Sequence, residues 1–187
     1  MQRLKVLFLS GAALVGSCLS LEAANRFYIG NKTVGAGTTG NVVSVMADMD
    51  QDTYGYSISL QYDAAKLAMT EVTMGGAATP LSPEFYDGTV TTSPGRVFYG
   101  VVFDLTNPIT KKLSSGTGRE ALKLTIEVKA TTASTTVLDL ANIPGDLPRR
   151  NVMTDSNGDS LVPTLVDGTL TISTDLPPVI QLIRGNS

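Results

Sequence analysis

The sequence predicts an all-β protein, a jelly-roll (Greek-key) antiparallel β-sandwich of about nine strands. Three observations favour this fold class. Short stretches alternate between apolar and polar residues with a period of two, which is the spacing of a half-buried strand. Turn residues separate these stretches at regular intervals, and almost no segment has the apolar spacing of a helix. Hydrophobic residues make up 42% of the 187 residues, which is enough for one core of ordinary size.

Residues 1–24 are expected to be a signal peptide. Arg3 and Lys5 precede an apolar run that ends in small residues at Ala24, and the run is too short to span a bilayer. A second interpretation is lipid attachment at Cys18, because small residues precede this cysteine as they do in bacterial lipoprotein signals. Under both interpretations the domain at 25–175 is exported, and it would be secreted, extracellular or in the cell envelope. A membrane contact is expected only in the lipidated case.

The first three strands are expected at residues 26–34, 41–50 and 54–62, with a glycine-rich loop between the first two. The third strand alternates most cleanly, so its two faces can be assigned from parity. Its core-facing side chains are expected to be Tyr56, Ile58, Leu60 and Tyr62. Its outward side chains are expected to be Ser57, Ser59 and Gln61.

The middle of the domain is expected to add two strands and two long loops. Asp63 is expected to be the N-cap of one helical turn, after which a strand runs over 67–74. Residues 76–95 are rich in proline and glycine and are expected to form a loop. An aromatic and β-branched strand follows at 96–104, and a second loop covers 105–118.

The last third of the domain is expected to supply four strands. The first, at 119–130, has a rival helical interpretation over its first half, but its β-branched residues favour a strand. Its outward side chains are expected to include Lys123, Thr125 and Glu127. A short strand follows near 134–140. Asp167-Gly168 is expected to join the last two strands, 161–166 and 169–172, as a hairpin.

The order of these pieces resembles a bacterial cohesin domain, from a superfamily that also contains carbohydrate-binding modules. That family has an alternating strand ending in Tyr-Asp, a short turn, and then a leucine followed by a valine. Tyr62-Asp63 and residues 67–72 fit this pattern. The family closes with Asn-Gly, a hydrophobic strand and an Asp/Asn-Gly turn, which correspond to Asn157-Gly158 and Asp167-Gly168 here. The resemblance covers residues 27–174.

The resemblance implies a nine-stranded jelly-roll with a binding role. One flat sheet face would hold a dockerin, a small calcium-binding helical partner, in assemblies that degrade polysaccharide. From strand parity, the expected partner-binding residues are Ser57, Ser59, Gln61, Lys123, Thr125 and Glu127. The tail at 176–187 ends in "IQLIRGNS", which resembles the beginning of a dockerin segment. It is interpreted either as a truncated linker to a dockerin or as an ordinary terminal tail.

Composition argues against an enzyme and against a nucleic-acid partner. The chain has no histidine, which is the usual general base, and no motif brings a pair of acidic residues together. A net charge of −3 provides no basic surface for nucleic acid. Two other roles stay open: direct binding of polysaccharide, which needs exposed aromatic rings, and a structural role at the cell surface. Phe98 and Tyr99 are neighbours, so one of these rings must point out of the sheet.

No cofactor is expected, and calcium is the one metal that the acidic loops suggest. Asp155, Asn157 and Asp159 alternate as in a calcium loop, but the glycine stands at the fourth position rather than the sixth. "DMDQD" at 48–52 also alternates, and it lacks the later glycine and glutamate. Both segments are more typical of solvated turns between strands.

Overall fold

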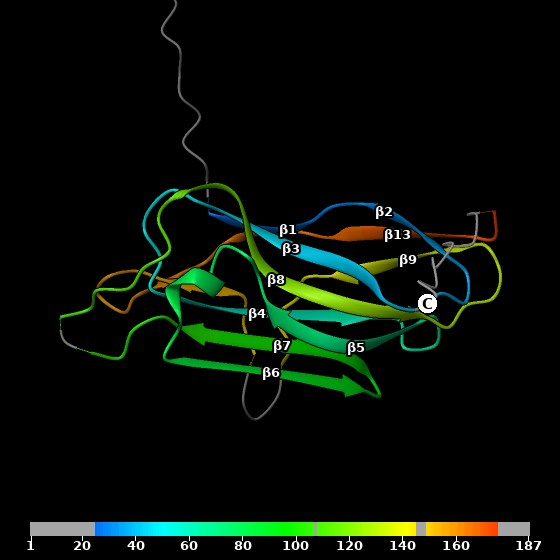
Figure 1. Cartoon of the computed structure of the whole chain (residues 1–187), viewed down its shortest axis with the longest axis horizontal. Coiled ribbons are helices and arrows are strands. Elements are labelled where there is room, and N and C mark those ends of the chain that lie inside the picture. The colour runs from blue at the N-terminus through cyan, green and yellow to red at the C-terminus, as the bar shows by residue number, and fades with distance from the viewer. Residues whose placement is uncertain (1–24, 107, 145–148, 176–187) are drawn as a thin grey trace, which may run out of the picture.

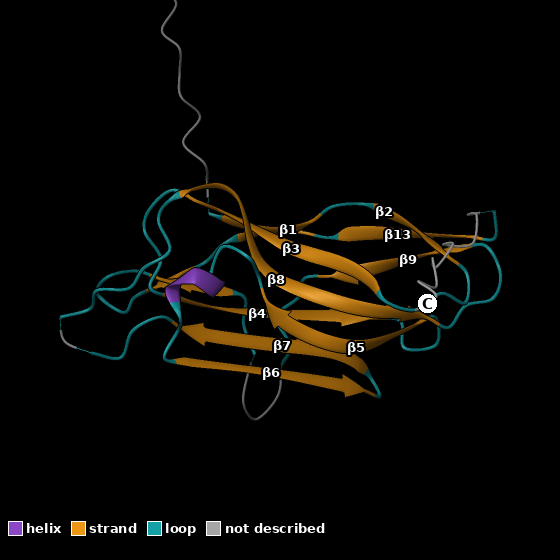
Figure 2. Ribbon diagram, viewed as in Figure 1, coloured by secondary structure: helices purple, strands orange, loops and turns teal. Residues whose placement is uncertain are grey.

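Strands make up most of the chain that the structure describes. The computed structural model describes residues 25–106, 108–144 and 149–175. The predictions of a signal peptide, of lipid attachment at Cys18 and of a tail at 176–187 lie outside these residues. Within the described ranges, thirteen strands are accompanied by a single 3₁₀ turn, η1 (Thr79–Leu81) (Figure 2).

The strands form two sheets. The five-stranded sheet contains, in spatial order, β12 (Thr164–Val166), β1 (Arg26–Ile29), β3 (Asn41–Met49), β8 (Gly116–Val128) and β5 (Leu67–Met74). The eight-stranded sheet contains β11 (Ser160–Leu161), β10 (Val152–Thr154), β4 (Gly55–Tyr62), β9 (Ser134–Asp139), β13 (Gly168–Ser173) and β2 (Lys32–Gly35). Along the other edge of β4 this sheet continues through β7 (Gly95–Val102) to β6 (Phe85–Thr92), which lies lowest in Figure 1.

The core lies between the two sheets, which confirms the predicted sandwich. The four core-facing predictions on β4 are confirmed, because Tyr56, Ile58, Leu60 and Tyr62 are all buried. The matching apolar residues of β8 are Leu122, Leu124, Ile126 and Val128. Tyr56 also ties the layers together: its hydroxyl donates to the Ala121 carbonyl at 2.6 Å, and its ring packs edge-to-face on Phe27.

The first predicted strand is two strands in different sheets. β1 pairs with β3 in the five-stranded sheet, whereas β2 pairs in parallel with β13 in the eight-stranded sheet. The chain crosses between the layers at Gly30 and Asn31, and the Asn31 side-chain oxygen accepts the Thr169 N–H at 2.9 Å. The single strand predicted over 26–34 was therefore wrong, because alternation does not show where a chain changes sheet.

The predicted hairpin at Asp167-Gly168 was also wrong. β12 pairs in parallel with β1, and β13 pairs with β9 in the other sheet, so the two strands lie in different layers. Gly168 stands where the chain crosses over Ile29, because a Cβ added there would come within 2.3 Å of the Ile29 side chain. The glycine allows a close approach between segments rather than a tight turn.

Residues 76–95 contain a strand where a loop was expected. β6 pairs along its whole length with β7 and with no other strand, so it is an edge strand. Most of its residues are exposed, and an edge strand of this kind needs no regular apolar face.

The turn predicted at Asp63 is confirmed: the Leu67 N–H donates to the Asp63 carbonyl, and the Ala65 N–H donates to the Asp63 carboxylate.

Candidate docking surface

The six predicted contact residues lie on two opposite faces of the sandwich. Ser57, Ser59 and Gln61 belong to β4 in the eight-stranded sheet, while Lys123, Thr125 and Glu127 belong to β8 in the five-stranded sheet. Each triplet alternates with the core residues of its own strand, so the triplets face away from each other. The expectation that all six share one flat surface was wrong, because parity separates inside from outside but does not identify the layer.

The outer face of the eight-stranded sheet is built by the register of β10, β4, β7 and β6. Ser57 stands opposite Val152 on one side and Gly100 on the other, and Gly100 in turn stands opposite Asp87. In the next row, Phe98 stands between Ser59 and Thr89. We call this surface the β4–β7 face and define it by Ser57, Phe85, Asp87, Phe98, Gly100 and Val152.

Ser59 is fully buried, although it lies on the outward parity. The side chain of Asn151 forms two hydrogen bonds with its backbone: the Ser59 N–H donates to Oδ1 at 2.8 Å, and Nδ2 donates to the Ser59 carbonyl at 3.0 Å. Phe98 stands beside Ser59 in the register. The backbone of Ser59 therefore holds the segment before β10 on the sheet. The Ser59 side chain is buried and is not available to contact a partner.

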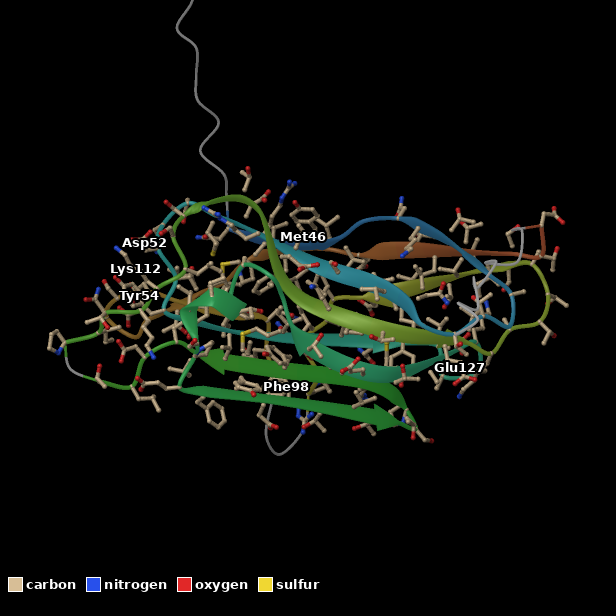
Figure 3. All side chains as sticks on the ribbon, viewed as in Figure 1. Met46, Asp52, Tyr54, Phe98, Lys112 and Glu127 are labelled. Carbon is tan, nitrogen blue, oxygen red and sulfur yellow. The ribbon has the colours of Figure 1, made fainter. Side chains whose placement is uncertain are left out.

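Phe98 is the aromatic anchor of the β4–β7 face. Of the neighbouring pair, Phe98 points out of the sheet and Tyr99 points into the core. The guanidinium of Arg149 lies 4.9 Å from the centre of the Phe98 ring, which stabilises the ring by a cation–π contact. Figure 3 labels Phe98 on the lower strands of the view, away from Glu127 on the other sheet.

Two shallow hollows flank Phe98. One, of about 270 Å³, is lined by Phe85, Asp87, Phe98, Gly100 and Val152 among others. The other, of about 350 Å³, shares Ser57, Phe98 and Val152 with the first and extends to Asn151 and the exposed Val162. Gly100 lacks a side chain, so nothing fills the floor beneath the edge of the Phe98 ring. An apolar centre with a polar rim is the usual anatomy of a protein–protein interface.

The outer face of the five-stranded sheet is different, because its polar groups bind one another. Glu120 accepts a hydrogen bond from the Ser44 hydroxyl at 2.7 Å and from the Gly76 N–H at 2.8 Å, and it lies 3.4 Å from the Lys123 ammonium group. Burial alone would raise the pKa of Glu120, but the bonds from Ser44, Gly76 and Lys123 lower it overall. The Thr125 hydroxyl is directed to Glu71.

Asp104 orders the loop that follows β7, at the end of the strand nearest Phe85. Its carboxylate accepts the hydroxyl and N–H groups of both Thr106 and Thr110, and the Lys111 N–H as well. Hydrogen bonds from Thr106, and then from Thr110, hold the pKa of Asp104 far below its ordinary value. The carboxylate is therefore ionised whenever the protein is folded near neutral pH, and the loop is fixed around it.

The acidic loops form turns. Asp155 Oδ1 accepts the N–H groups of Asn157 and Asp159 within the turn between β10 and β11, so this oxygen is bonded to the backbone of its own turn. In "DMDQD", Asp48 pairs with Arg26 and Asp52 pairs with Lys112, and the two carboxylates serve different partners. Among the described residues, no group of three His, Cys, Asp or Glu side chains is placed to hold a metal ion.

Comparison with known proteins identifies the fold. No family model and no curated protein matches the sequence. Solved structures do match. The cohesin of a type I cohesin–dockerin complex from Clostridium thermocellum, Coh-OlpA-Doc918, is 16% identical with a TM-score of 0.64, and the match covers 80% of this chain and 99% of that one. The chain has a cohesin-like fold.

Other cohesins also match this cohesin-like chain. CaCohA2 from Clostridium acetobutylicum is 16% identical with a TM-score of 0.64, and the match covers 83% of this chain and 95% of that one. A non-cellulosomal cohesin from the archaeon Archaeoglobus fulgidus is 17% identical with a TM-score of 0.56, and the match covers 81% of this chain and 92% of that one.

In the described part of the chain, no helix has the length and apolar character needed to cross a membrane.

Proposed function

We propose that the protein is a secreted, non-catalytic binding module that holds a dockerin-bearing partner through the β4–β7 face. The cohesin-like fold supports this role, because several of the similar structures are cohesin–dockerin complexes. The proposal places the module in an extracellular or cell-surface assembly that acts on polysaccharide. Lipid attachment at Cys18 and the tail at 176–187 would decide whether the module is anchored or joined to a further segment.

The choice of face rests on one observation, the position of Phe98 between two hollows on an otherwise ordered sheet. Binding energy at protein interfaces concentrates in a few aromatic or arginine side chains that become fully desolvated near the centre. Phe98 and its partner Arg149 have this chemistry, and Gly100 leaves room beside them for an apolar side chain of the partner. On the five-stranded sheet, Ser44 and Lys123 are already bonded to Glu120, so docking over this group would break existing bonds.

The test is a titration of the mature chain, by calorimetry, with dockerin-bearing proteins isolated from the secretome of the source organism. Phe98→Ala is expected to weaken binding by about tenfold to a hundredfold, because the central anchor is lost. Gly100→Val is expected to weaken it as well by filling the hollow. Thr125→Ala, on the opposite face, is the matched control and is expected to bind as the parent does.

Two outcomes would reject the proposal. Tight binding of a dockerin by Phe98→Ala and Gly100→Val together with loss of binding by Thr125→Ala would move the interface to the five-stranded sheet. Failure to bind any dockerin-bearing protein, in calcium and after chelation alike, would remove the docking role itself. Thermal unfolding of each variant should stay within a few degrees of the parent, because all three positions face outward.

Direct binding of polysaccharide is the second candidate, and one observation favours it. Phe85 and Phe98 share the β4–β7 face and line the same hollow, so two rings are available for stacking on sugar. This role predicts retention of the parent chain on insoluble polysaccharide and loss of retention in Phe85→Ala. A parent chain that passes unretained through a panel of polysaccharides would exclude it.

A further inference from the structure

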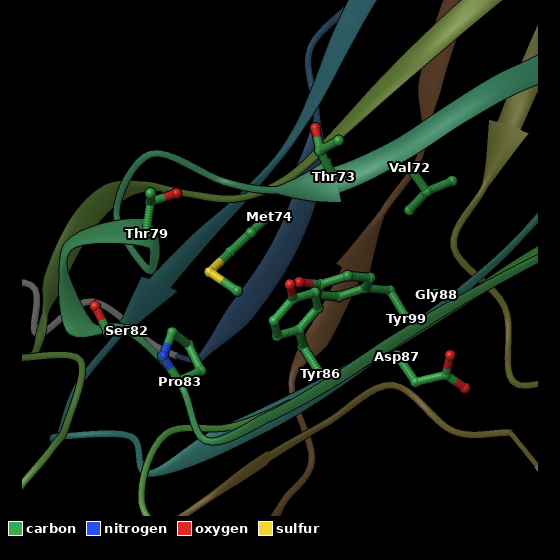
Figure 4. A pocket seen from close by; sticks show the side chains of 10 residues that line it. All are labelled: Val72, Thr73, Met74, Thr79, Ser82, Pro83, Tyr86, Asp87, Gly88 and Tyr99. Atoms are coloured by element: carbon green, nitrogen blue, oxygen red, sulfur yellow. The ribbon is translucent and has the colours of Figure 1, made fainter.

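A third hollow lies where the sandwich is open at one side, and it shares only Asp87 with the residues that define the β4–β7 face. It has a volume of about 590 Å³ and lies between β5 of one sheet and β6 of the other (Figure 4). Its main walls are Val72, Met74, Pro83, Tyr86, Gly88 and Tyr99. We call it the edge slot. It exists because β5 and β6 are both the last strands of their sheets on this side, so no further strand closes the core.

Gly88 makes the edge slot deep. It lies on the core-facing parity of β6, between Tyr86 and Val90, where a side chain would otherwise fill the space between the sheets. A Cβ added at Gly88 would lie 3.1 Å from the Tyr99 ring and 3.7 Å from Val72. The missing side chain therefore leaves the ring of Tyr99 as the floor of the slot.

The hydroxyl of Tyr99 is a buried donor without a partner. Tyr99 is only 1% exposed, and its Oη has no hydrogen-bond partner among the described residues. Tyr56, another buried tyrosine of the core, shows the usual arrangement, since its hydroxyl donates to a carbonyl. Burial, and then the neighbouring Tyr86, raises the pKa of Tyr99 to about 12, so the group keeps its proton at neutral pH.

Two of the other polar groups of the slot are unavailable to a ligand at Tyr99. The Thr79 hydroxyl donates to the Gly75 carbonyl at 3.0 Å. Asp87 is the charged residue among the described lining residues, and Figure 4 shows its carboxylate directed away from the tyrosine rings and from β5. A charged ligand would lose its hydration without a counter-charge in the slot. A sugar, with a hydroxyl on most carbons, would find too few partners.

We propose that the edge slot binds a small, neutral and mainly apolar molecule, with an aromatic ring or a branched alkyl group and one oxygen that hydrogen-bonds to the Tyr99 hydroxyl. The volume lies within the range of ordinary ligand sites, which combine apolar walls with a few well-placed polar groups. Tyr86 lies at the mouth with 61% of its surface exposed. The proposal requires its ring to move aside, because the Tyr99 hydroxyl is itself buried. This site is independent of the proposed docking role.

The experiment compares two probes of equal shape, phenol and toluene, by amide NMR titration of the mature chain. Phenol is expected to shift the resonances of β5 and β6 and to bind about fivefold to tenfold more tightly than toluene, because only phenol can pair with Tyr99. Tyr99→Phe is expected to remove that preference while keeping the fold, since it deletes only an unpaired hydroxyl. Gly88→Val fills the slot and is expected to abolish binding of both probes.

Several results would overturn the proposal. These are equal affinities of phenol and toluene for the parent chain, a preference that survives Tyr99→Phe, shifts centred away from β5 and β6, or tighter binding of cellobiose than of phenol. Should Gly88→Val fail to fold, Gly88→Ala provides the smaller filling change, and Tyr99→Phe decides the outcome alone. Tyr99→Phe should leave dockerin binding unchanged, so a failure of this proposal and a failure of the docking role give different results.

Discussion

The two outer faces of the sandwich are built from the same alternating strands, yet their outward groups differ in what they leave available. On the β4–β7 face, Phe98 and Val152 stay half-exposed beside hollows, and Arg149 covers one side of the Phe98 ring. On the five-stranded sheet, Ser44 and Lys123 both serve Glu120. The first face offers apolar surface next to hollows. The second offers polar groups that are paired around Glu120, and its exposed apolar residue Val42 lines none of the three hollows.

This difference teaches which property of a sheet marks it for docking. Alternation makes both faces polar and solvent-exposed, so polarity alone does not select between them. An interface gains most from burying apolar surface held in a fixed position, and loses when existing polar pairs must be desolvated. The β4–β7 face combines a fixed ring, Phe98, with open space beside it. The five-stranded sheet also carries an outward ring, Tyr28, with the Arg26 guanidinium 4.6 Å from its centre, but none of the three hollows is lined by it.

The largest expected effect comes from Asn151→Ala. This change would break the two hydrogen bonds that hold the segment before β10 on the eight-stranded sheet. The variant loses both bonds to the Ser59 backbone and leaves a buried N–H and C=O without partners. We expect the free energy of unfolding to fall by about 2–4 kcal/mol. Dockerin binding should weaken at the same time, because Arg149 and Val152 flank this residue. Urea denaturation at neutral pH measures the loss.

Thr125→Ala is the matched control for that loss, and its free energy of unfolding should stay within about 0.5 kcal/mol of the parent. A similar small change in Asn151→Ala would mean that the segment before β10 is held by other contacts. The ordered β4–β7 face would then not depend on the residue to which we attribute it.

Much of the fold could be predicted from the sequence because alternation reports burial directly. Ile58 and Leu124 are core residues on opposite sheets, and both were assigned from period-two patterns that the structure confirms. β6 was missed because it is an exposed edge strand, in which neither apolar alternation nor long residues are required. The two layer crossings, at Asn31 and Gly168, were missed because they depend on contacts between the two ends of the chain.

The candidate site was harder to predict than the core. Ser59 was assigned outward by parity, but its burial depends on Asn151, which lies 92 residues further along the chain. The choice between Phe98 and Tyr99 depends on the register between β7 and β4, where Phe98 pairs with Ser59 and Tyr99 with Ile58. A local pattern contains neither the register nor the identity of the layer, and both decide which residues share a surface.

Lowering the pH should destabilise the Asp104 loop and the Glu120 cluster over different pH ranges, and this effect is expected to be of intermediate size. The pKa of Asp104 is held below its ordinary 3.8 by Thr106 and Thr110, and that of Glu120 is lowered from 4.5 in spite of burial. A lowered pKa in the folded state contributes stability that is fully present above the ordinary value and is lost as the pH falls toward the folded value. Loss should therefore begin near pH 4.5 for Glu120 and near pH 3.8 for Asp104.

Because the pKa of Asp104 is lowered much further, its share of the loss should continue to lower pH than that of Glu120. Thermal unfolding between pH 2 and pH 6 measures both shares. Asp104→Asn should flatten the slope below pH 3.8, and Glu120→Gln should flatten it from about pH 4.5 downward. Parallel slopes in the parent and both variants would show that other carboxylates control acid unfolding.

The smallest expected effect comes from charge reversal on the five-stranded sheet, and it decides between the two predicted triplets. Lys123→Glu removes one exposed ion pair with Glu120, which is worth at most about 1 kcal/mol, and Glu127→Lys breaks no ion pair in the described residues. If the partner docks on the β4–β7 face, both variants should bind a dockerin as the parent does, at 0.05 M and at 0.5 M salt. Weaker binding that recovers with salt would instead assign the interface to β8, and Phe98→Ala would then be expected to bind normally.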